Sequence, residues 1–287
     1  MLTILSLKNR LYYNHNNDYN IAMYYILASE LKVIEKRFTA KPHLDLVEIP
    51  KSYLLKAGDD SYVITEDNAI QVFRFGMTPN LASHQQNLIT ARAEGKKNGN
   101  DDPFYNGSKA IFLLPEFKRP IFSQRCIVIA DAFYAMSNNK PYLVYLQNKI
   151  RPIGIAGVYN VWENPLSKEI IKGFAIITIA SNSMLQSIGV KRMPVILPVN
   201  YETDWLKNTL TLSKVLNYLV PFSSEKMNAY PVSEMVNMDG VNDISLLNPI
   251  GEKLQKEELP AMIIRSSHYH KTKPTSNEPW FKSEGKG

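Results

Sequence analysis

Seven short apolar runs between residues 62 and 197 constrain the fold of this chain more than any other feature. Each run spans four to seven residues and is rich in β-branched and aromatic side chains, which is typical of strands. Clusters of Gly, Pro, Asn and Lys separate the runs and predict turns or loops. The predicted strands are 62–65, 70–75, 126–130, 141–146, 153–159, 174–179 and 193–197. Because regular strand–helix alternation is missing, the pattern predicts an α+β fold with mixed, largely antiparallel sheets.

Helices are predicted to be few and short. Leu31, Ile34 and Phe38 recur at helical spacing, which predicts an amphipathic helix over 30–38 with Ser29 as its N-cap. Four further short helices are predicted over 85–94, 181–188, 201–206 and 212–219.

Both ends of the chain differ in composition from its middle. A polar tract from Tyr12 to Ile21 has no amphipathic period, so residues 1–22 are predicted to be an N-terminal extension. The segment after Ile264 is basic and poor in aliphatic residues, which predicts a disordered tail over 265–287. A single domain is therefore expected over 23–264.

Charge and cysteine content narrow the function classes. The 287 residues include 33 Lys and Arg against 27 Asp and Glu, and this net charge of +6 permits binding to a polyanion without requiring it. The single cysteine, Cys126, excludes an internal disulfide and a cysteine-based zinc site, and it fits a cytoplasmic protein. No apolar run reaches the ~18 residues of a membrane helix. We expect a monomer without cofactor or metal, and we expect His268 and His270 to be solvated.

Eight short segments, read in order, carry a family resemblance. They are Arg74-Phe-Gly-Met-Thr-Pro79, Thr90-Ala-Arg-Ala-Glu94, Arg125-Cys-Ile-Val-Ile-Ala-Asp-Ala-Phe-Tyr134, Ala156-Gly-Val-Tyr-Asn-Val-Trp162, Phe174-Ala-Ile-Ile-Thr-Ile-Ala-Ser-Asn182, Lys191-Arg-Met-Pro-Val-Ile-Leu197, Trp205-Leu206 and Ala229-Tyr-Pro-Val-Ser233. In this order and spacing, from about residue 23 to 237, the chain resembles the SOS-response-associated peptidase (SRAP) family.

The resemblance implies a fold and an activity. It implies a compact domain with a barrel-like core and a positive cleft for single-stranded DNA, in a protein of the DNA damage (SOS) response. Members of the family capture abasic sites covalently and are also regarded as self-peptidases. Their nucleophile is an N-terminal cysteine whose amine forms an imine with the sugar aldehyde and whose thiol then closes a thiazolidine. An Asn, a Glu and a His complete the family's site.

This sequence departs from the family pattern at all four of these positions. The resemblance places Tyr24 at the position of the cysteine, Thr90 at that of the Asn, Ala135 at that of the Glu and Gly189 at that of the His. A tyrosine phenol has a pKa of ~10 and has no thiol to close the ring, and Ala135 and Gly189 have no side-chain proton to exchange. The sequence therefore predicts that no catalytic group of the family is intact.

Side chains beside the lost groups are retained. The resemblance assigns Arg92 and Arg192 to the DNA cleft, and it places Phe75 where the family has a Trp that stacks near the flipped nucleotide. Arg74, next to Phe75, is also predicted to bind DNA. A Phe still provides a stacking surface worth ~1 to 3 kcal/mol per base. The alternatives are structural roles, in which both arginines pair with Glu94 or Asp131 and Phe75 lies in the core. Cys126 is also expected to lie in the core.

Three hypotheses follow. The first is a catalytically degenerate SRAP protein that retains weak binding to single-stranded DNA. The second is an active crosslinking enzyme or peptidase in which Glu94, Asp131 or Tyr134 replaces the lost groups. The third is a protein-interaction module without enzymatic activity.

Overall fold

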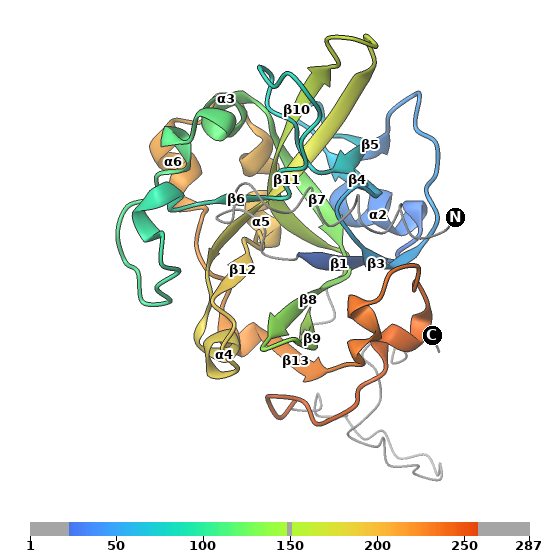
Figure 1. Cartoon of the computed structure of the whole chain (residues 1–287), viewed down its shortest axis with the longest axis vertical. Coiled ribbons are helices and arrows are strands. Elements are labelled where there is room, and N and C mark those ends of the chain that lie inside the picture. Colours follow the sequence, from blue (N-terminus) through green and yellow to red (C-terminus); the bar gives the residue numbers. More distant parts are fainter. Residues whose placement is uncertain (1–22, 148–150, 258–287) are drawn as a thin grey trace, which may run out of the picture.

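A closed ring of five strands forms the centre of the computed structural model, which describes residues 23–147 and 151–257 (Figure 1). Four antiparallel pairings join neighbouring strands, and β5 closes the ring by pairing parallel to β11 through Phe75 and Phe174. In ring order the strands are β11 (Ile170–Ala180), β10 (Ile153–Glu163), β7 (Arg125–Ala130), β4 (Asp60–Ile64) and β5 (Ala69–Phe75). The predicted barrel-like core is confirmed.

Three short strands extend this sheet at its margins. They are β12 (Arg192–Pro194), antiparallel to β11, β6 (Thr90–Arg92), parallel to β11, and β2 (Lys41–Pro42), parallel to β5. A second, fully antiparallel sheet of five strands lies beside the barrel. In spatial order it contains β13 (Met227–Pro231), β9 (Lys140–Leu146), β8 (Ala132–Ser137), β1 (Tyr24–Leu27) and β3 (Ser52–Leu55).

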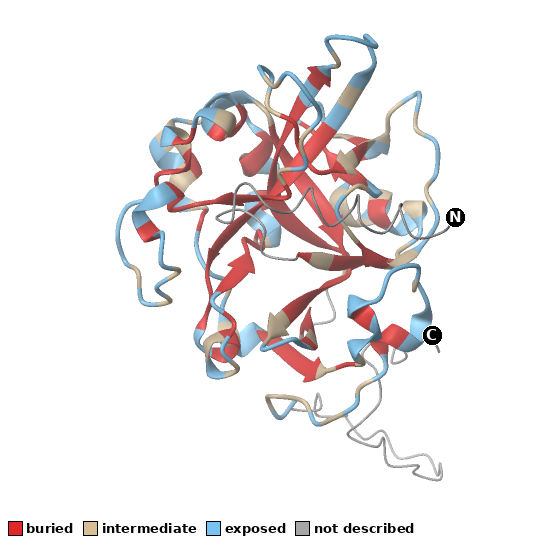
Figure 2. Cartoon of the chain, in the orientation of Figure 1, coloured by how far each residue is buried: buried red, intermediate tan, exposed pale blue. Residues whose placement is uncertain are grey.

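Burial explains why these runs become strands. Every residue of β7 is buried, as expected for a strand covered on both faces, whereas β10 is exposed only towards its end, at Val161 and Glu163 (Figure 2). The large core cluster fills the barrel, and a smaller one lies under the outer face of the second sheet. Cys126 is buried in β7, and burial raises the pKa of its thiol.

Helices cover the barrel at its edges. They are α2 (Leu31–Phe38), α3 (Pro115–Ser123), α4 (Ser183–Ser187), α5 (Val199–Leu206) and α6 (Leu212–Asn217), with the 3-10 turns η1 (Gly95–Asn98), η2 (Ile111–Leu113), η3 (Ser224–Lys226), η4 (Glu234–Asn237) and η5 (Ile244–Leu247). None of the helices in the described ranges is long and apolar enough to cross a membrane.

Arg125 at the start of β7 fixes two of these helices. Its buried guanidinium donates to the carbonyls of Ile121 and Phe122 at the end of α3, and to those of Trp205 and Lys207 at the end of α5, over 2.6 to 2.8 Å. A cation at a helix C-terminus satisfies carbonyls that have no partner within the helix.

The sequence prediction fails at several points. Six of the thirteen strands in the described residues, β1, β2, β3, β6, β8 and β13, lie outside the predicted runs. The helix predicted over 85–94 is wrong, because residues 90–92 pair with β11 as β6. No helix was expected over 115–123, where Pro115 begins α3 and Pro120 lies inside it. Ser29 is not the N-cap of α2: its hydroxyl donates to Asp131, and Glu30 takes the cap position without a side-chain hydrogen bond. The predicted extension, the predicted tail and residues 258–264 lie outside the described residues.

Candidate functional site

The pairing of β1 with β8 decides which predicted site residues share a face. Tyr24 pairs with Tyr134 and Tyr25 with Phe133. Because side chains alternate across a strand, Tyr24 and Tyr134 lie on one face of the sheet, and Tyr25, Phe133 and Ala135 on the other. The packing agrees, since Tyr24 packs against the smaller cluster and Ala135 belongs to the barrel cluster. The side chains at the predicted cysteine and glutamate positions therefore point to opposite faces.

Apolar side chains surround Ala135. Met23, Tyr25 and Phe133 belong to the same core cluster, and Met23 and Ala135 are only 4% and 5% exposed. Tyr25 is completely buried, and this burial raises the pKa of its phenol, so the hydroxyl stays neutral at physiological pH. We name Met23, Tyr25, Phe133 and Ala135 the β1–β8 seam. It contains a thioether, two aromatic rings and a methyl group, and none of these exchanges a proton at neutral pH.

Gly189 has a structural reason to be glycine. It follows α4 with a φ of +80°, a left-handed conformation that glycine adopts without strain. The Gly189 amide donates to the Gln186 carbonyl at 2.8 Å and the Val190 amide to the Leu185 carbonyl at 3.0 Å, which is a Schellman motif. A Cβ at Gly189 would lie 3.6 Å from the Ser137 hydroxyl on β8. The structure thus brings Gly189 to the end of the strand that carries Ala135.

Thr90 lies in the other sheet. It begins β6, pairs with Ile176 of β11 and is 2% exposed. Two residues further along β6, Arg92 begins the polar part of the predicted site.

Arg192 is the centre of a buried ionic cluster. Its guanidinium contacts a Glu94 oxygen at 2.8 Å and an Asp101 oxygen at 3.1 Å, and it donates to the Thr178 carbonyl at 2.8 Å. Arg92 pairs with the same Asp101 oxygen and donates to the Asn98 carbonyl. The side chains of Arg192 and Glu94 are 0% and 1% exposed. We name Arg92, Glu94, Asp101 and Arg192 the arginine cluster.

The charge state of Glu94 follows from this packing. Burial alone would raise the pKa of the Glu94 carboxyl, but the charge and hydrogen bond of Arg192 outweigh it and lower the pKa. The second Glu94 oxygen accepts from the Ala180 amide at 3.0 Å. Both arginines are thus paired inside the fold, with Glu94 and Asp101 but not with Asp131. Their predicted contact with DNA phosphate stays a prediction that their positions in this structure do not favour.

Phe75 offers no surface to a base in this structure. The ring is completely buried, stacked on Phe174 at 5.2 Å between centroids and edge-on to Tyr25 at 5.3 Å. It belongs to the core, and a stacking role would require it to become exposed. Arg74, its neighbour on β5, is half-buried and lies beside Gly58, with a terminal nitrogen 3.4 Å from where a Gly58 Cβ would stand.

The groups considered as catalytic replacements are also engaged. The Asp131 carboxylate accepts from the backbone amides of Ala28 and Ser29 at 2.6 and 2.8 Å, and burial raises its pKa. The Tyr134 hydroxyl donates to the Tyr53 carbonyl at 2.8 Å, and burial raises its pKa. With Glu94 held by Arg192, all three serve the fold in this structure.

A feature that the sequence analysis did not single out is the loop over residues 95–109, which projects beside β6 (Figure 1). It carries the exposed Lys96 and Lys97 and the aromatic ring of Phe104, which is 81% exposed. Its middle is fixed by Asp101 in the arginine cluster, and Gln186 of α4 donates to the Pro103 carbonyl at 3.2 Å. The signal that could have found it is a long polar loop with lysines near both ends and two aromatic residues between them.

The loop also borders a pocket of about 610 Å³. Gly107, Ser108 and Lys109 form one side, and η2 and α6 form the other through Phe112, Leu212, Ser213, Leu216, Asn217 and Val220.

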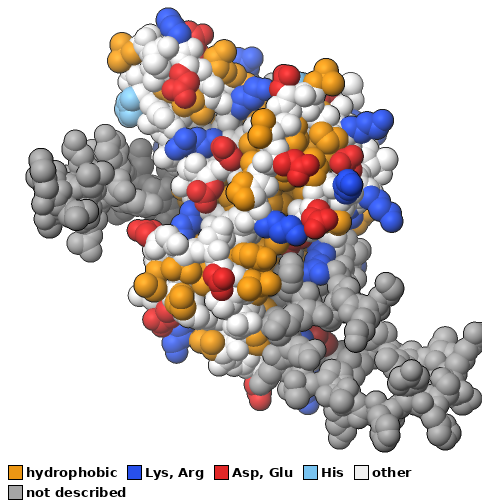
Figure 3. All heavy atoms as spheres, turned by 90° about the vertical axis from the view of Figure 1, so that its right-hand side faces the viewer, with side chains coloured by type: hydrophobic (Ala, Val, Ile, Leu, Met, Phe, Trp, Pro, Cys, Tyr) orange, Lys and Arg blue, Asp and Glu red, His pale blue; other side chains and the backbone are white. Residues whose placement is uncertain are grey.

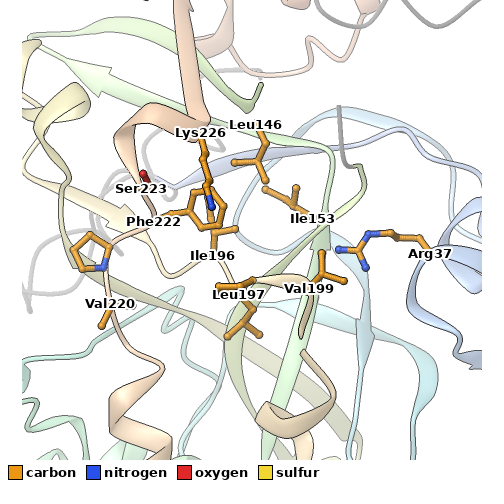
Figure 4. A pocket seen from close by; sticks show the side chains of 12 residues that line it. Arg37, Leu146, Ile153, Ile196, Leu197, Val199, Val220, Phe222, Ser223 and Lys226 are labelled. Atoms are coloured by element: carbon orange, nitrogen blue, oxygen red, sulfur yellow. The ribbon is translucent and has the colours of Figure 1, made fainter. Parts of the chain in front are cut away.

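A second pocket, of about 270 Å³, is mostly apolar. Figure 4 shows Ile153, Ile196 and Leu197 gathered between Lys226 and Arg37. Arg37 is bound to Glu202 through two hydrogen bonds of 2.8 and 2.9 Å. None of the predicted site residues lines this pocket.

The face of the molecule that lies away from the 95–109 loop has no predominant charge. Figure 3 shows basic and acidic side chains interspersed on that face, without a continuous positive surface. Within residues 23–147 and 151–257, no group of three or more His, Cys, Asp or Glu side chains is placed to hold a metal ion. His268 and His270 lie outside these residues.

Comparison with known proteins agrees with this architecture. The chain is 28% identical over 234 residues to abasic site processing protein YoqW of Bacillus subtilis, covering 78% of this chain and 97% of that protein. It is 28% identical over 151 residues to abasic site processing protein HMCES of Xenopus tropicalis, covering 45% of this chain and 43% of that protein. A crystal structure of a Bacteroides thetaiotaomicron protein superposes with a TM-score of 0.67 at 25% identity, covering 78% of this chain and 97% of that one. Residues 23–239 match the family described as SOS response associated peptidase (SRAP), and the chain therefore belongs to the SRAP family.

Proposed function

We propose that this protein acts in the DNA damage response by binding single-stranded DNA, abasic sites included, without forming the thiazolidine adduct implied for its family. The observation that carries the proposal is the β1–β8 seam, where buried apolar side chains face Ala135. A thiazolidine needs an amine and a thiol on one residue, and no thiol lies in the seam. In the described residues the only cysteine is Cys126, buried in β7.

The backbone at Tyr24 supports the same conclusion. Tyr24 lies within β1, so its nitrogen belongs to a peptide bond in a strand and not to a free amine. Its side chain lies on the face away from Ala135. A substrate held at one face of this sheet would not meet both positions.

Binding to DNA is supported by the relatives and by the surface near α4. The related proteins YoqW and HMCES are both named for abasic site processing. The 95–109 loop places Lys96, Lys97 and Phe104 in solvent, and Lys191 is exposed next to the arginine cluster. Lysines attract the phosphate backbone and an exposed ring stacks on a base, which is how proteins bind single strands without sequence preference. The proposal includes a cytoplasmic monomer without a metal or cofactor.

A denaturing gel tests the covalent part. The purified full chain is incubated with a labelled single-stranded oligonucleotide that contains one abasic site. We expect no band of protein-linked DNA after denaturation. A denaturant-stable adduct at stoichiometric yield would contradict the proposal and favour an active enzyme with replacement residues.

A titration tests the binding part. We expect the fluorescence anisotropy of the same oligonucleotide to rise with protein at low salt, and the affinity to fall with a linear log–log slope as salt increases. A double variant with Phe104→Ala and Lys97→Ala should bind the oligonucleotide at least several-fold more weakly. A control variant, Lys168→Ala, changes an exposed and distant lysine and should bind as the parent does. If no binding is measurable at low salt, the protein is an interaction module and not a DNA-binding protein.

A further inference from the structure

The side chain of Lys109 is held beside the arginine cluster by the backbone around it. The amides of Ala110 and Ile111 both donate to the Ala93 carbonyl, at 2.8 and 3.0 Å. Gly95 allows this close approach, since it has a φ of +58° and a Cβ there would lie 2.7 Å from the Ala110 carbonyl oxygen. Lys109 therefore emerges next to Glu94, at the point where the 95–109 loop returns to the barrel.

The amine of Lys109 differs from the other lysines of this loop. Lys96 and Lys97 are exposed, whereas Lys109 is half-buried and lines the pocket of about 610 Å³ between the loop and α6. Among the described residues, no hydrogen bond or ion pair holds its amine, while the Lys97 amine lies 3.3 Å from the Ser108 hydroxyl. The pocket wall offers Ser108, Ser213 and Asn217 as polar neighbours but no carboxylate.

The carboxylates of the arginine cluster are already paired with its two arginines, so no carboxylate is left to pair with the Lys109 amine. Arg92 and Arg192 are balanced by Glu94 and Asp101, so the ammonium form of Lys109 adds an uncompensated positive charge. Burial lowers the pKa of the Lys109 amine, the charge of Glu94 opposes this shift, and that of Arg192 adds to it. A lysine amine that is partly desolvated next to other cations is more often neutral, and a neutral amine is a nucleophile.

We propose that the Lys109 amine captures the aldehyde of an abasic site as a reversible imine. This inference rests on the proposed function, which brings abasic DNA to the 95–109 loop. The nitrogen lone pair attacks the C1′ carbon of the ring-opened sugar, and the proton lost by nitrogen moves to the oxygen to give a carbinolamine. The nitrogen lone pair then forms the C=N bond as the C–O bond breaks, and the hydroxyl group leaves as water with the second proton of the nitrogen, so that amine and aldehyde yield imine and water. No oxidant or reductant is consumed.

Reversibility makes this activity compatible with the absence of a stable adduct. An imine without a neighbouring thiol cannot close a thiazolidine, and water returns it to amine and aldehyde on denaturation. Lys109 would thus hold the damaged site transiently and release it unchanged.

Trapping with borohydride tests the inference. Hydride adds to the imine carbon and a proton to nitrogen, which gives a stable secondary amine that survives a denaturing gel. The full-length chain is compared with Lys109→Arg, which keeps the positive charge but is not nucleophilic, and with the control Lys168→Arg, which changes an exposed lysine away from the 95–109 loop. We expect the initial trapping rate to fall at least tenfold in Lys109→Arg and to change less than twofold in Lys168→Arg. Anisotropy and urea unfolding should be unchanged in both variants.

A second probe separates the chemistry from DNA binding. The protein is treated with 2-deoxyribose 5-phosphate and borohydride, and modified peptides are located by mass spectrometry. Preferential modification of Lys109 supports the inference whether or not the chain binds DNA. Equal trapping in all three proteins, modification spread over the exposed lysines, or no trapping would each overturn it. The proposed function fails separately, by a stable adduct without borohydride or by absent binding.

Discussion

The arginine cluster lies on the barrel sheet and the β1–β8 seam on the second sheet, and the two have opposite chemistry. The arginine cluster contains Arg92 and Arg192, which the family resemblance singles out, and the carboxylates Glu94 and Asp101 that pair with them. Each of these four side chains is bound to another group of the protein. The seam has the position where the resemblance places a catalytic carboxylate, and it is filled by apolar side chains. The retained charges are bound within the fold, whereas the position that the resemblance assigns to a catalytic carboxylate holds a methyl group. Contacts within the fold are therefore a sufficient reason for a family motif to keep its charged residues.

The largest expected loss of stability comes from a substitution that breaks the arginine cluster. Replacing Arg192 by Met leaves Glu94 buried without its partner, and loss of one member of a buried pair costs about 3 to 5 kcal/mol of unfolding free energy. Urea unfolding measures this loss. The exposed neighbour gives the control, because Lys191→Met should change stability by less than about 0.5 kcal/mol. Adding Glu94→Leu should restore at least half of the loss, and a double variant no more stable than Arg192→Met would contradict the pairing.

The second largest loss of stability is expected from a substitution that places a carboxylate in the β1–β8 seam. Ala135→Glu buries a charge beside Met23 and Tyr25 and should cost roughly 2 to 4 kcal/mol in the same assay. The matched control is Val161→Glu in β10, where the side chain is 43% exposed and the change should cost far less. If Ala135→Glu is as stable as the parent, the seam is a hydrated site and the contrast with the arginine cluster disappears.

A change at a backbone position should cost less. Gly189→Ala places a side chain at a φ of +80°, and the left-handed conformation costs about 1 to 2 kcal/mol for residues other than glycine. The nearest atom to an added Cβ would be the Ser137 hydroxyl oxygen at 3.6 Å, an ordinary contact, so packing adds little. Gly99→Ala, at a φ of −61°, should be nearly neutral in urea unfolding. Equal stability of Gly189→Ala and the parent would show that glycine is not required there by the backbone.

The smallest effect is a pH dependence that isolates Glu94. Because its pKa is lowered in the folded protein, the Glu94 carboxylate stabilises the fold at pH above the ordinary value of 4.5, and this contribution is lost as the pH falls through the folded-state pKa. Asp131 and Glu202 have raised pKa values and act in the opposite direction. The parent is therefore compared with Glu94→Gln by urea unfolding between pH 7 and 3. The stability difference should shrink on acidification, and a constant difference would contradict the assigned charge.

Much of the fold was predictable because it depends on local patterns. Short runs of β-branched and aromatic residues located seven strands, helical spacing located α2, and three further predicted helices correspond to α4, α5 and α6. The prediction failed over 85–94, where pairing with the distant β11 decides the structure, and at α3, where two prolines weakened the helical pattern. Propensity is a weak prior that tertiary contacts override.

The sequence alone determined which reactive groups this protein has. The chain has one cysteine, within an apolar run, and the resemblance assigns Tyr24, Thr90, Ala135 and Gly189 to the four positions of the family's reactive groups. The tertiary structure decided what the retained charges do. Arg92 and Arg192 are far apart in sequence from each other and Arg192 from Asp101, so only folding could show that they share this carboxylate and are buried by it. It also decided that Lys109, one lysine among many in the sequence, lies half-buried beside that cluster, because the electrostatic environment of a side chain depends on neighbours that the chain brings together from distant segments.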